Sequence, residues 1–189
     1  MSSSSSIVLG TVGLPLGSTA VDFDLQGVDG KKYSLDNFNG KNALVIVFSC
    51  NHCPYAQAYE QRIIQLQEDY KPRNVAIIAI NSNDDTNYPE DSFPNMVKRA
   101  SERHYNFPYV RDQTQDIARK FGAICTPHVF LFDKNRKLQY KGRIDDNWKD
   151  SSAAKTRDLR NAIDAVLDGS IPTVQETRPY GCSIKWKQS

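Results

Sequence analysis

An apolar segment that runs directly into two closely spaced cysteines and a proline constrains this chain most. Residues 43–48 are continuously apolar, which predicts a central strand covered on both faces. Cys50 and Cys53 follow, and Pro54 suits the first position of a helix. Apolar side chains then recur every three or four residues over 55–70, which predicts an amphipathic helix. The two thiols are therefore expected at a strand-to-helix junction of an α/β protein.

The spacing of the two cysteines suits a reversible disulfide. Cysteines three residues apart in a turn that enters a helix have Cα atoms about 5 to 6 Å apart, within the range that a disulfide requires. The unpaired N–H groups at the helix N-terminus favour a thiolate, as does His52 when it is protonated. Cys50, Cys53 and His52 are thus the candidate catalytic residues. A structural disulfide or a pair of inert core thiols is the alternative.

Length, charge and the N-terminus limit the class of protein. The 189 residues suit one domain with its own core. A net charge of +2 gives no reason to expect nucleic acid or an anionic membrane as a partner. Residues 1–13 carry no basic segment, and their apolar run is too short for a signal peptide or a membrane span. We expect a disordered leader and a cytoplasmic protein, in which four cysteines indicate catalysis or metal binding.

Strands and helices alternate along the rest of the chain. Alternating residues at 21–25, turn residues at 27–30 and the segment 31–35 predict an N-terminal β-hairpin. Periodicity and turn residues predict strands over 75–80, 107–110, 129–132 and 137–142, and helices over 93–105, 117–121 and 159–167. The tail 169–189 is expected to pack on this domain as an arm or an edge strand. The loop 81–92 could hold a cation through four carboxylates, although a solvated loop is favoured: Asp84, Asp85, Glu90 and Asp91.

The order of these elements resembles the thioredoxin-like fold in its redoxin or peroxiredoxin-like (AhpC/TSA) form. The likeness covers residues 14–168 and is carried by four segments: 20–25, 29–31, 48–54 and 126–133. The Asn-His-Cys-Pro motif and the segment 181–187 (Gly-Cys-Ser-Ile-Lys-Trp-Lys) resemble one subgroup of thioredoxin-domain redoxins. The resemblance implies a three-layer α/β/α sandwich with an N-terminal β-hairpin and a central mixed sheet, and an oxidoreductase that needs no cofactor.

The resemblance also implies roles for individual residues. A cis-proline faces the CxxC motif in this fold, so Pro127 is expected to be cis and beside Cys53, with Thr126 and Pro127 binding an extended substrate segment through their backbones. In oxidoreductases of this fold the nucleophile lies five positions after the strand aromatic, and counting from Phe48 leads to Cys53. The expected reaction is attack of the Cys53 thiolate on a protein disulfide or another oxidised thiol, resolved by Cys50.

A peroxiredoxin-like thiol peroxidase that uses Cys53 is the first alternative. Such an enzyme would carry Pro and Thr or Ser seven and three residues before that cysteine, where this chain has Ile46 and Cys50. Pro127 occupies the place of the arginine that holds peroxide, and Arg143 could replace it only by folding back towards the thiols. The alternative stays open because low-pKa thiolates react slowly with peroxide without a complete site.

Metal binding is the alternative from another class. Zinc could be held by Cys50 and Cys53 with Cys125 or His128, since the fold would bring their segments together. Cys125 and Cys182 are also possible additional redox residues. Free cysteine is often a small buried apolar residue, a role that we favour for Cys125 and leave open for Cys182. We expect a monomer or a homodimer.

Overall fold

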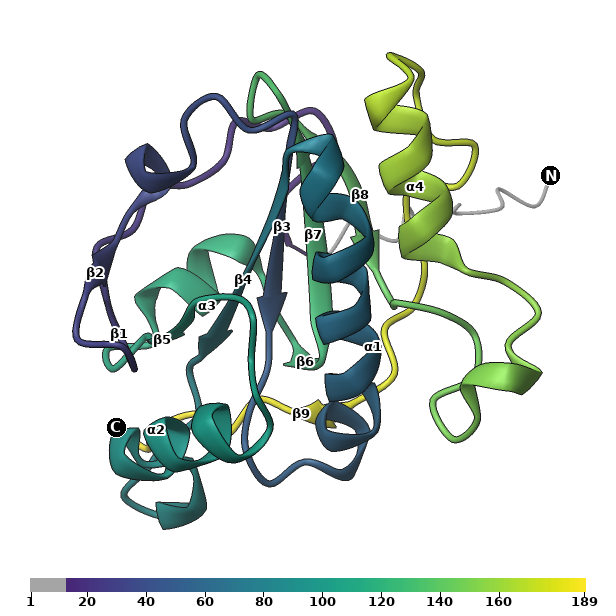
Figure 1. Cartoon of the computed structure of the whole chain (residues 1–189). Helices are drawn as coiled ribbons and strands as arrows, with labels where there is room; N and C mark the ends of the chain where they lie inside the picture. The colour runs from purple at the N-terminus through teal and green to yellow at the C-terminus, as the bar shows by residue number, and fades with distance from the viewer. Residues whose placement is uncertain (1–12) are drawn as a thin grey trace, which may run out of the picture.

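The computed structural model describes residues 13–189, which form a mixed β-sheet with helices on both faces (Figure 1). Apart from Gly13, the predicted disordered leader lies outside these residues. Within them the main sheet has the order β2-β1-β5-β4-β3-β7-β8. The strands are β1 (Leu25–Gly27), β2 (Lys32–Tyr33), β3 (Ala43–Phe48), β4 (Val75–Asn81), β5 (Tyr109–Arg111), β6 (Cys125–Thr126), β7 (His128–Asp133), β8 (Leu138–Gly142) and β9 (Cys182–Ser183). The helices are α1 (Pro54–Tyr70), α2 (Phe93–Glu102), α3 (Asp116–Phe121) and α4 (Asp158–Leu167), with short 3-10 segments η1 (Leu35–Phe38), η2 (Lys71–Arg73), η3 (Pro89–Asp91) and η4 (Ser151–Ala153).

The central strand β3 is buried on both faces, as its apolar sequence predicts. It pairs in parallel with β4 and antiparallel with β7, so the sheet is mixed. Val45 and Val47 pack into the core beneath α1, α2 and α4, whereas Ile46 and Phe48 pack into the core beneath α3. Full burial of side chains of this size stabilises a fold by about 1.5–3 kcal/mol each. The two cores give the predicted three-layer α/β/α arrangement.

Helix α1 crosses the sheet with its apolar side inward and lies beside α4 (Figure 1). The hydroxyl of Tyr70, the last residue of α1, donates a hydrogen bond to Asp164 Oδ1 of α4 at 2.7 Å. Pro54 is the first residue of α1, and Cys53 is its N-cap with an extended backbone (φ −73°, ψ 124°). The strand β3 and the helix α1 therefore hold the CxxC motif between them, as predicted.

The N-terminal hairpin and the helix predicted over 93–105 differ in extent from the prediction. The N-terminal hairpin is confirmed, but β1 begins only at Leu25, because Asp22 Oδ1 accepts hydrogen bonds from the N–H groups of Phe23 and Leu35 and holds residues 21–24 as a loop. The helix predicted over 93–105 ends at Glu102. The chain leaves the helix there and passes through the left-handed region at His104 (φ 55°).

The C-terminal tail forms a second, two-stranded sheet. Strand β9 pairs antiparallel with β6, with Cys182 opposite Thr126 and Ser183 opposite Cys125. In Figure 1 the tail, drawn in yellow, crosses below the main sheet near the start of α1. The tail, predicted as an arm or an edge strand, contributes a strand of only two residues to this separate sheet. Within the described residues, no helix is both long and apolar enough to cross a membrane.

Candidate active site

The two thiols of the CxxC motif lie where β3 ends and α1 begins, opposite the loop that contains Pro127. Cys50 is 1% exposed and Cys53 is fully buried, and both are free thiols. Cys50 Sγ lies 3.2 Å from Thr126 Oγ1, and Cys53 Sγ lies 3.3 Å from the carbonyl oxygen of Thr126. The Thr126–Pro127 peptide bond is cis, as the resemblance implies. Both thiols therefore contact the same residue of the cis-proline loop.

The surroundings of the two thiols separate their pKa values. A hydrogen bond from the Cys50 thiol is the largest effect on Cys53 and lowers its pKa, although burial acts in the opposite direction. Hydrogen bonds from the Cys182 thiol, from its backbone N–H and from the N–H of Ala56 lower it further. The bond with Cys53 and burial raise the pKa of Cys50, and the charge of Asp91 raises it again. The negative charge of the pair is therefore most stable on Cys53.

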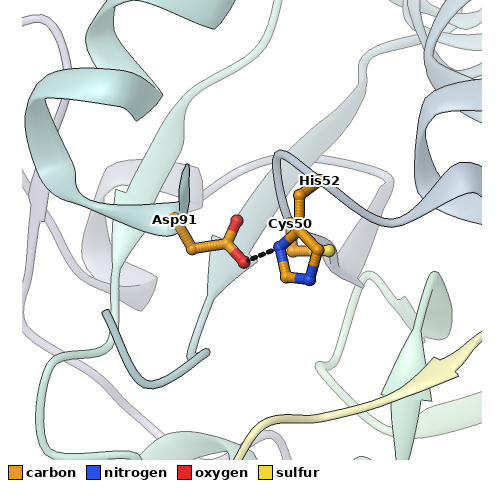
Figure 2. A group of neighbouring side chains, drawn as sticks. All are labelled: Cys50, His52 and Asp91. Carbon is orange, nitrogen blue, oxygen red and sulfur yellow. Dashed lines mark hydrogen bonds and ion pairs between the residues drawn. The ribbon is translucent and has the colours of Figure 1, made fainter. Parts of the chain in front are cut away.

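Asp91 is the buried centre of a hydrogen-bond network around the loop of the motif. Its Oδ1 accepts from the backbone N–H of Asn51 at 2.6 Å and from Asn81 Nδ2 at 3.2 Å. Its Oδ2 accepts from Asn83 Nδ2 at 2.9 Å and contacts His52 Nδ1, as Figure 2 shows. A buried carboxylate needs such donors, because leaving it unpaired is costly. The prediction of a solvated loop is therefore wrong for Asp91, which is 0% exposed.

Asp84 is also buried, in contrast to the predicted solvated loop. It is 2% exposed, and its carboxylate accepts hydrogen bonds from the N–H of Thr86 at 3.0 Å and from Asn87 Nδ2 at 2.6 Å. The backbone N–H of Asp84 donates to the carbonyl oxygen of Lys185 in the tail at 2.8 Å. The loop thus folds on itself and supports the C-terminal tail.

His52 and Asn51 are fixed by residues that are far apart in the sequence. The ring of His52 stacks on Tyr88, with centroids 5.6 Å apart and planes 7° from parallel. Asn51 Oδ1 accepts from the hydroxyl of Tyr109 at 2.7 Å, and its Nδ2 donates to the carbonyl oxygen of Glu90 at 2.9 Å. The sequence gives no periodic signal for these partners, because they come from the loop 82–92 and from the strand β5. The loop between the cysteines is held rigidly in place.

The two remaining cysteines lie near the motif but differ in exposure. Cys125 is buried, its Sγ lies 3.8 Å from the carbonyl oxygen of Pro127, and burial raises its pKa to about 12. Cys182 is half-buried and packs against the cluster of Cys50, Cys53 and Ala56. Burial, followed by the hydrogen bond to Cys53, raises the pKa of Cys182.

Comparison with known proteins identifies the family. The Redoxin family model matches residues 15–157. The chain belongs to the Redoxin family. It is 28% identical over 126 residues to the thiol-disulfide oxidoreductase ResA of Geobacillus thermodenitrificans, which covers 66% of this chain and 67% of that protein. It is 42% identical to an uncharacterized conserved protein from Geobacillus kaustophilus, with a TM-score of 0.87 over 93% of this chain and 94% of that one.

A more distant structure supports the fold class. A putative thioredoxin from Neisseria meningitidis is 22% identical, with a TM-score of 0.63 over 80% of this chain and 91% of that one. The predicted thioredoxin-like fold and redoxin resemblance are confirmed, and this redoxin is an oxidoreductase. The antioxidant role, the cytoplasmic location and the oligomeric state stay predictions.

The predicted zinc ligands do not all come together in this redoxin: Cys50 and Cys53 share one cluster, but neither Cys125 nor His128 joins them within ligand distance among the described residues. His128 Nδ1 accepts a hydrogen bond from the N–H of Ile124 at 3.3 Å, and its ring packs on Phe130 in the core beneath α3. Among the described residues, the ligand atoms that do gather within 4.8 Å belong to Cys50, His52 and Asp91 (Figure 2). Asp91 is already saturated by hydrogen bonds from the protein. The contact between His52 and Asp91 in this cluster is part of the hydrogen-bond network around Asp91.

Arg143 does not fold back to the thiols of this redoxin. Its Nε donates to Asp158 Oδ2 at 2.7 Å, and its guanidinium also contacts Thr156 and the hydroxyl of Tyr180. These bonds join the loop after β8 to the start of α4 and to the tail. The condition under which Arg143 would complete a peroxiredoxin-like site is not met.

Proposed function

We propose that this redoxin is a thiol-disulfide oxidoreductase with Cys53 as the attacking thiolate and Cys50 as the resolving thiol. The observation that carries the proposal is the position of Cys53, at the N-cap of α1, where hydrogen bonds from Cys50, Cys182 and the first turn lower its pKa. A thiol of low pKa is mostly thiolate at neutral pH, and the thiolate is the form that attacks disulfides. The name of the ResA relatives supports the same reaction class.

The proposed reaction moves two electrons to a protein disulfide. Cys53 Sγ attacks one sulfur of the partner, the partner S–S bond breaks, and the released thiolate takes up a proton. Cys50 then loses its proton and attacks Cys53 Sγ, which frees the second partner thiol and leaves a Cys50–Cys53 disulfide. His52, with Asp91, stands beside Cys50 and is placed to accept that proton. Thr126 contacts both thiols, and with Pro127 it forms the loop that would bind the substrate segment.

Alkylation of each thiol against pH tests these roles. Iodoacetamide labelling is followed by mass spectrometry of the tryptic peptide 42–62 in the wild type, Cys50→Ser, Cys50→Ala and Cys53→Ser, with insulin reduction measured in parallel. In Cys50→Ser, where a hydroxyl still donates to Cys53, we expect the midpoint of the Cys53 alkylation rate to lie well below pH 8.5. In Cys50→Ala we expect that midpoint to move to higher pH. Insulin reduction is expected to disappear in Cys53→Ser.

Two results would overturn the proposal. One is that neither thiol titrates below the ordinary value for cysteine, about 8.5, while insulin stays oxidised. The other is that Cys53→Ser still reduces insulin. If instead Cys50 keeps a low pKa when Cys53 is replaced, the assigned roles of the two thiols are reversed.

Peroxide reduction is a second candidate because Cys53 is completely buried. A small oxidant needs less opening of the structure around Cys53 than a protein disulfide does. It would convert Cys53 to a sulfenic acid that condenses with Cys50 and releases water. Peroxide consumption should then require Cys53 and persist in part in Cys50→Ser. Equal consumption by the wild type and Cys53→Ser would exclude this activity.

A further inference from the structure

The C-terminal tail lies across the cis-proline loop, where a substrate segment would have to pair. The register of β6 and β9 places Cys182 directly opposite Thr126, the residue that both thiols of the motif contact. Gly181 allows this approach, because a Cβ atom at that position would lie 2.2 Å from the carbonyl oxygen of Thr126. The tail therefore occupies the edge of the loop that the proposed function assigns to substrate.

Several contacts anchor the tail beyond β9. The N–H of Ile184 donates to the carbonyl oxygen of Ile124 at 3.1 Å, and the Ile184 side chain is 3% exposed in the core beneath α3. The N–H of Lys185 donates to Asn83 Oδ1 at 2.9 Å, and its carbonyl oxygen accepts from Gln115 Nε2 at 2.8 Å. These bonds fix the position of Cys182 in the folded protein.

Cys182 is the cysteine that connects the buried pair with the surface. It packs against the cluster that contains both thiols of the motif, and its thiol and backbone N–H help to lower the pKa of Cys53. Of the four cysteines, Cys50, Cys53 and Cys125 are buried and Cys182 alone is partly exposed. A disulfide between Cys50 and Cys53 would therefore be shielded from an external reductant.

We propose that Cys182 is a third redox-active thiol, through which the buried Cys50–Cys53 disulfide is reduced again by an external dithiol. This step rests on the proposed function, because it returns the oxidised dithiol to its active form. The proposal assigns a reaction to the tail, whose strand β9 also covers the edge of the cis-proline loop.

The proposed sequence has two exchanges. Cys182 loses its proton and attacks Cys53 Sγ, the Cys50–Cys53 bond breaks, and Cys50 leaves as a thiolate that takes up a proton. An external dithiol then attacks Cys182 Sγ, expels Cys53 as a thiolate, and closes its own disulfide by displacing Cys182, which takes up a proton. The external dithiol is oxidised by two electrons, and all three thiols of the chain are regained.

Electrostatics favours attack by Cys182 once Cys53 is oxidised, and it favours the second exchange. While Cys53 is a thiolate, its charge and hydrogen bond keep the pKa of Cys182 raised. Once Cys53 is bound in a disulfide, that charge is gone, and Lys185 still favours a Cys182 thiolate. In the second exchange Cys53 is a good leaving group, because thiols of low pKa leave faster. In the first exchange Cys50 has to be protonated as it leaves, because its pKa is raised. The second exchange places the negative charge on Cys53, where the protein stabilises it.

The direct test measures how fast the oxidised protein is reduced by dithiothreitol. We expect Cys182→Ser to slow reduction of the Cys50–Cys53 disulfide at least tenfold compared with the wild type. The matched control is Cys182→Ser combined with Ser183→Cys, which keeps a third thiol in β9 but points it to the opposite face of the strand. That variant should stay as slow as Cys182→Ser. A rate within twofold of the wild type in Cys182→Ser, or recovery in the control, would overturn the proposal.

Trapping gives a second readout that does not depend on a rate. Cys50→Ser treated with one equivalent of diamide should link Cys53 to Cys182, which appears as a disulfide between tryptic peptides 42–62 and 161–185. Absence of this linked pair would also contradict the proposal. If the wild type reduces insulin and Cys53→Ser does not, while these tests fail, only the role of Cys182 is wrong. If Cys53→Ser still reduces insulin, the proposed function fails first.

Discussion

At the scale of single residues, Asp91 illustrates how one buried carboxylate fixes the loop between Cys50 and Cys53. Its oxygens accept from Asn51, Asn81 and Asn83 and contact His52. We expect Asp91→Asn to lower the free energy of unfolding by about 1–3 kcal/mol, because an amide NH₂ replaces one acceptor and faces other donors. Urea unfolding at pH 7 measures the change.

Glu90→Gln is the matched control for Asp91→Asn. Glu90 is adjacent in the sequence, but its side chain is exposed, so the substitution is expected to stay within about 0.5 kcal/mol of the wild type. If Asp91→Asn is as stable as Glu90→Gln, the network contributes little to the fold.

At the scale of elements, the short strand β9 controls access to the buried thiols. A Cβ at position 181 would meet the backbone of Thr126, which cannot yield as a flexible side chain does. Overpacking of this kind costs about 1–3 kcal/mol, and 1.4 kcal/mol corresponds to a tenfold larger open population. We therefore expect Gly181→Ala to accelerate alkylation of Cys53 by about tenfold or more at pH 7.

The exposed Ser183 provides the control within the same strand. Ser183→Ala removes a hydroxyl and introduces no clash, so Cys53 should react at the wild-type rate. The control of access by β9 would be refuted if Gly181→Ala and Ser183→Ala were alkylated equally fast.

The same elements show which parts of the structure were predictable from the sequence. The strand β3 and the helix α1 follow from continuous apolar residues and a helical period, since local patterns determine their burial. The burial of Asp91 was not predictable, because Asn51 and His52 come from the loop of the motif, which meets this segment only in the fold. The pairing of Cys182 with Thr126 had only a weak signal, since a two-residue strand shows no usable alternation. The position of Cys182 depends on the close approach of the tail to the Thr126 backbone, which Gly181 permits.

At the scale of the whole molecule, the buried His128 predicts a loss of stability in acid. Burial, followed by the positive charge of Lys141, lowers the pKa of His128 from 6.5 to about 3. Between these values the unfolded chain binds a proton that the folded protein does not bind. The free energy of unfolding should therefore fall as the pH falls below 6.5, by up to about 1.4 kcal/mol per pH unit from this residue.

Urea unfolding between pH 7 and pH 4.5 tests this dependence on His128. We expect His128→Asn to lose stability less steeply than the wild type as the pH falls, because Asn offers an acceptor to Ile124 and does not titrate. It should be less stable at pH 7, since the ring that packs on Phe130 is lost.

His104→Asn is the control for His128→Asn. His104 is exposed with a positive φ of 55°, a conformation that Asn tolerates. In this variant the free energy of unfolding should change with pH as steeply as in the wild type. Equal slopes in all three proteins would mean that the folded protein accepts the proton at His128 as readily as the unfolded chain, and that acid instability arises elsewhere.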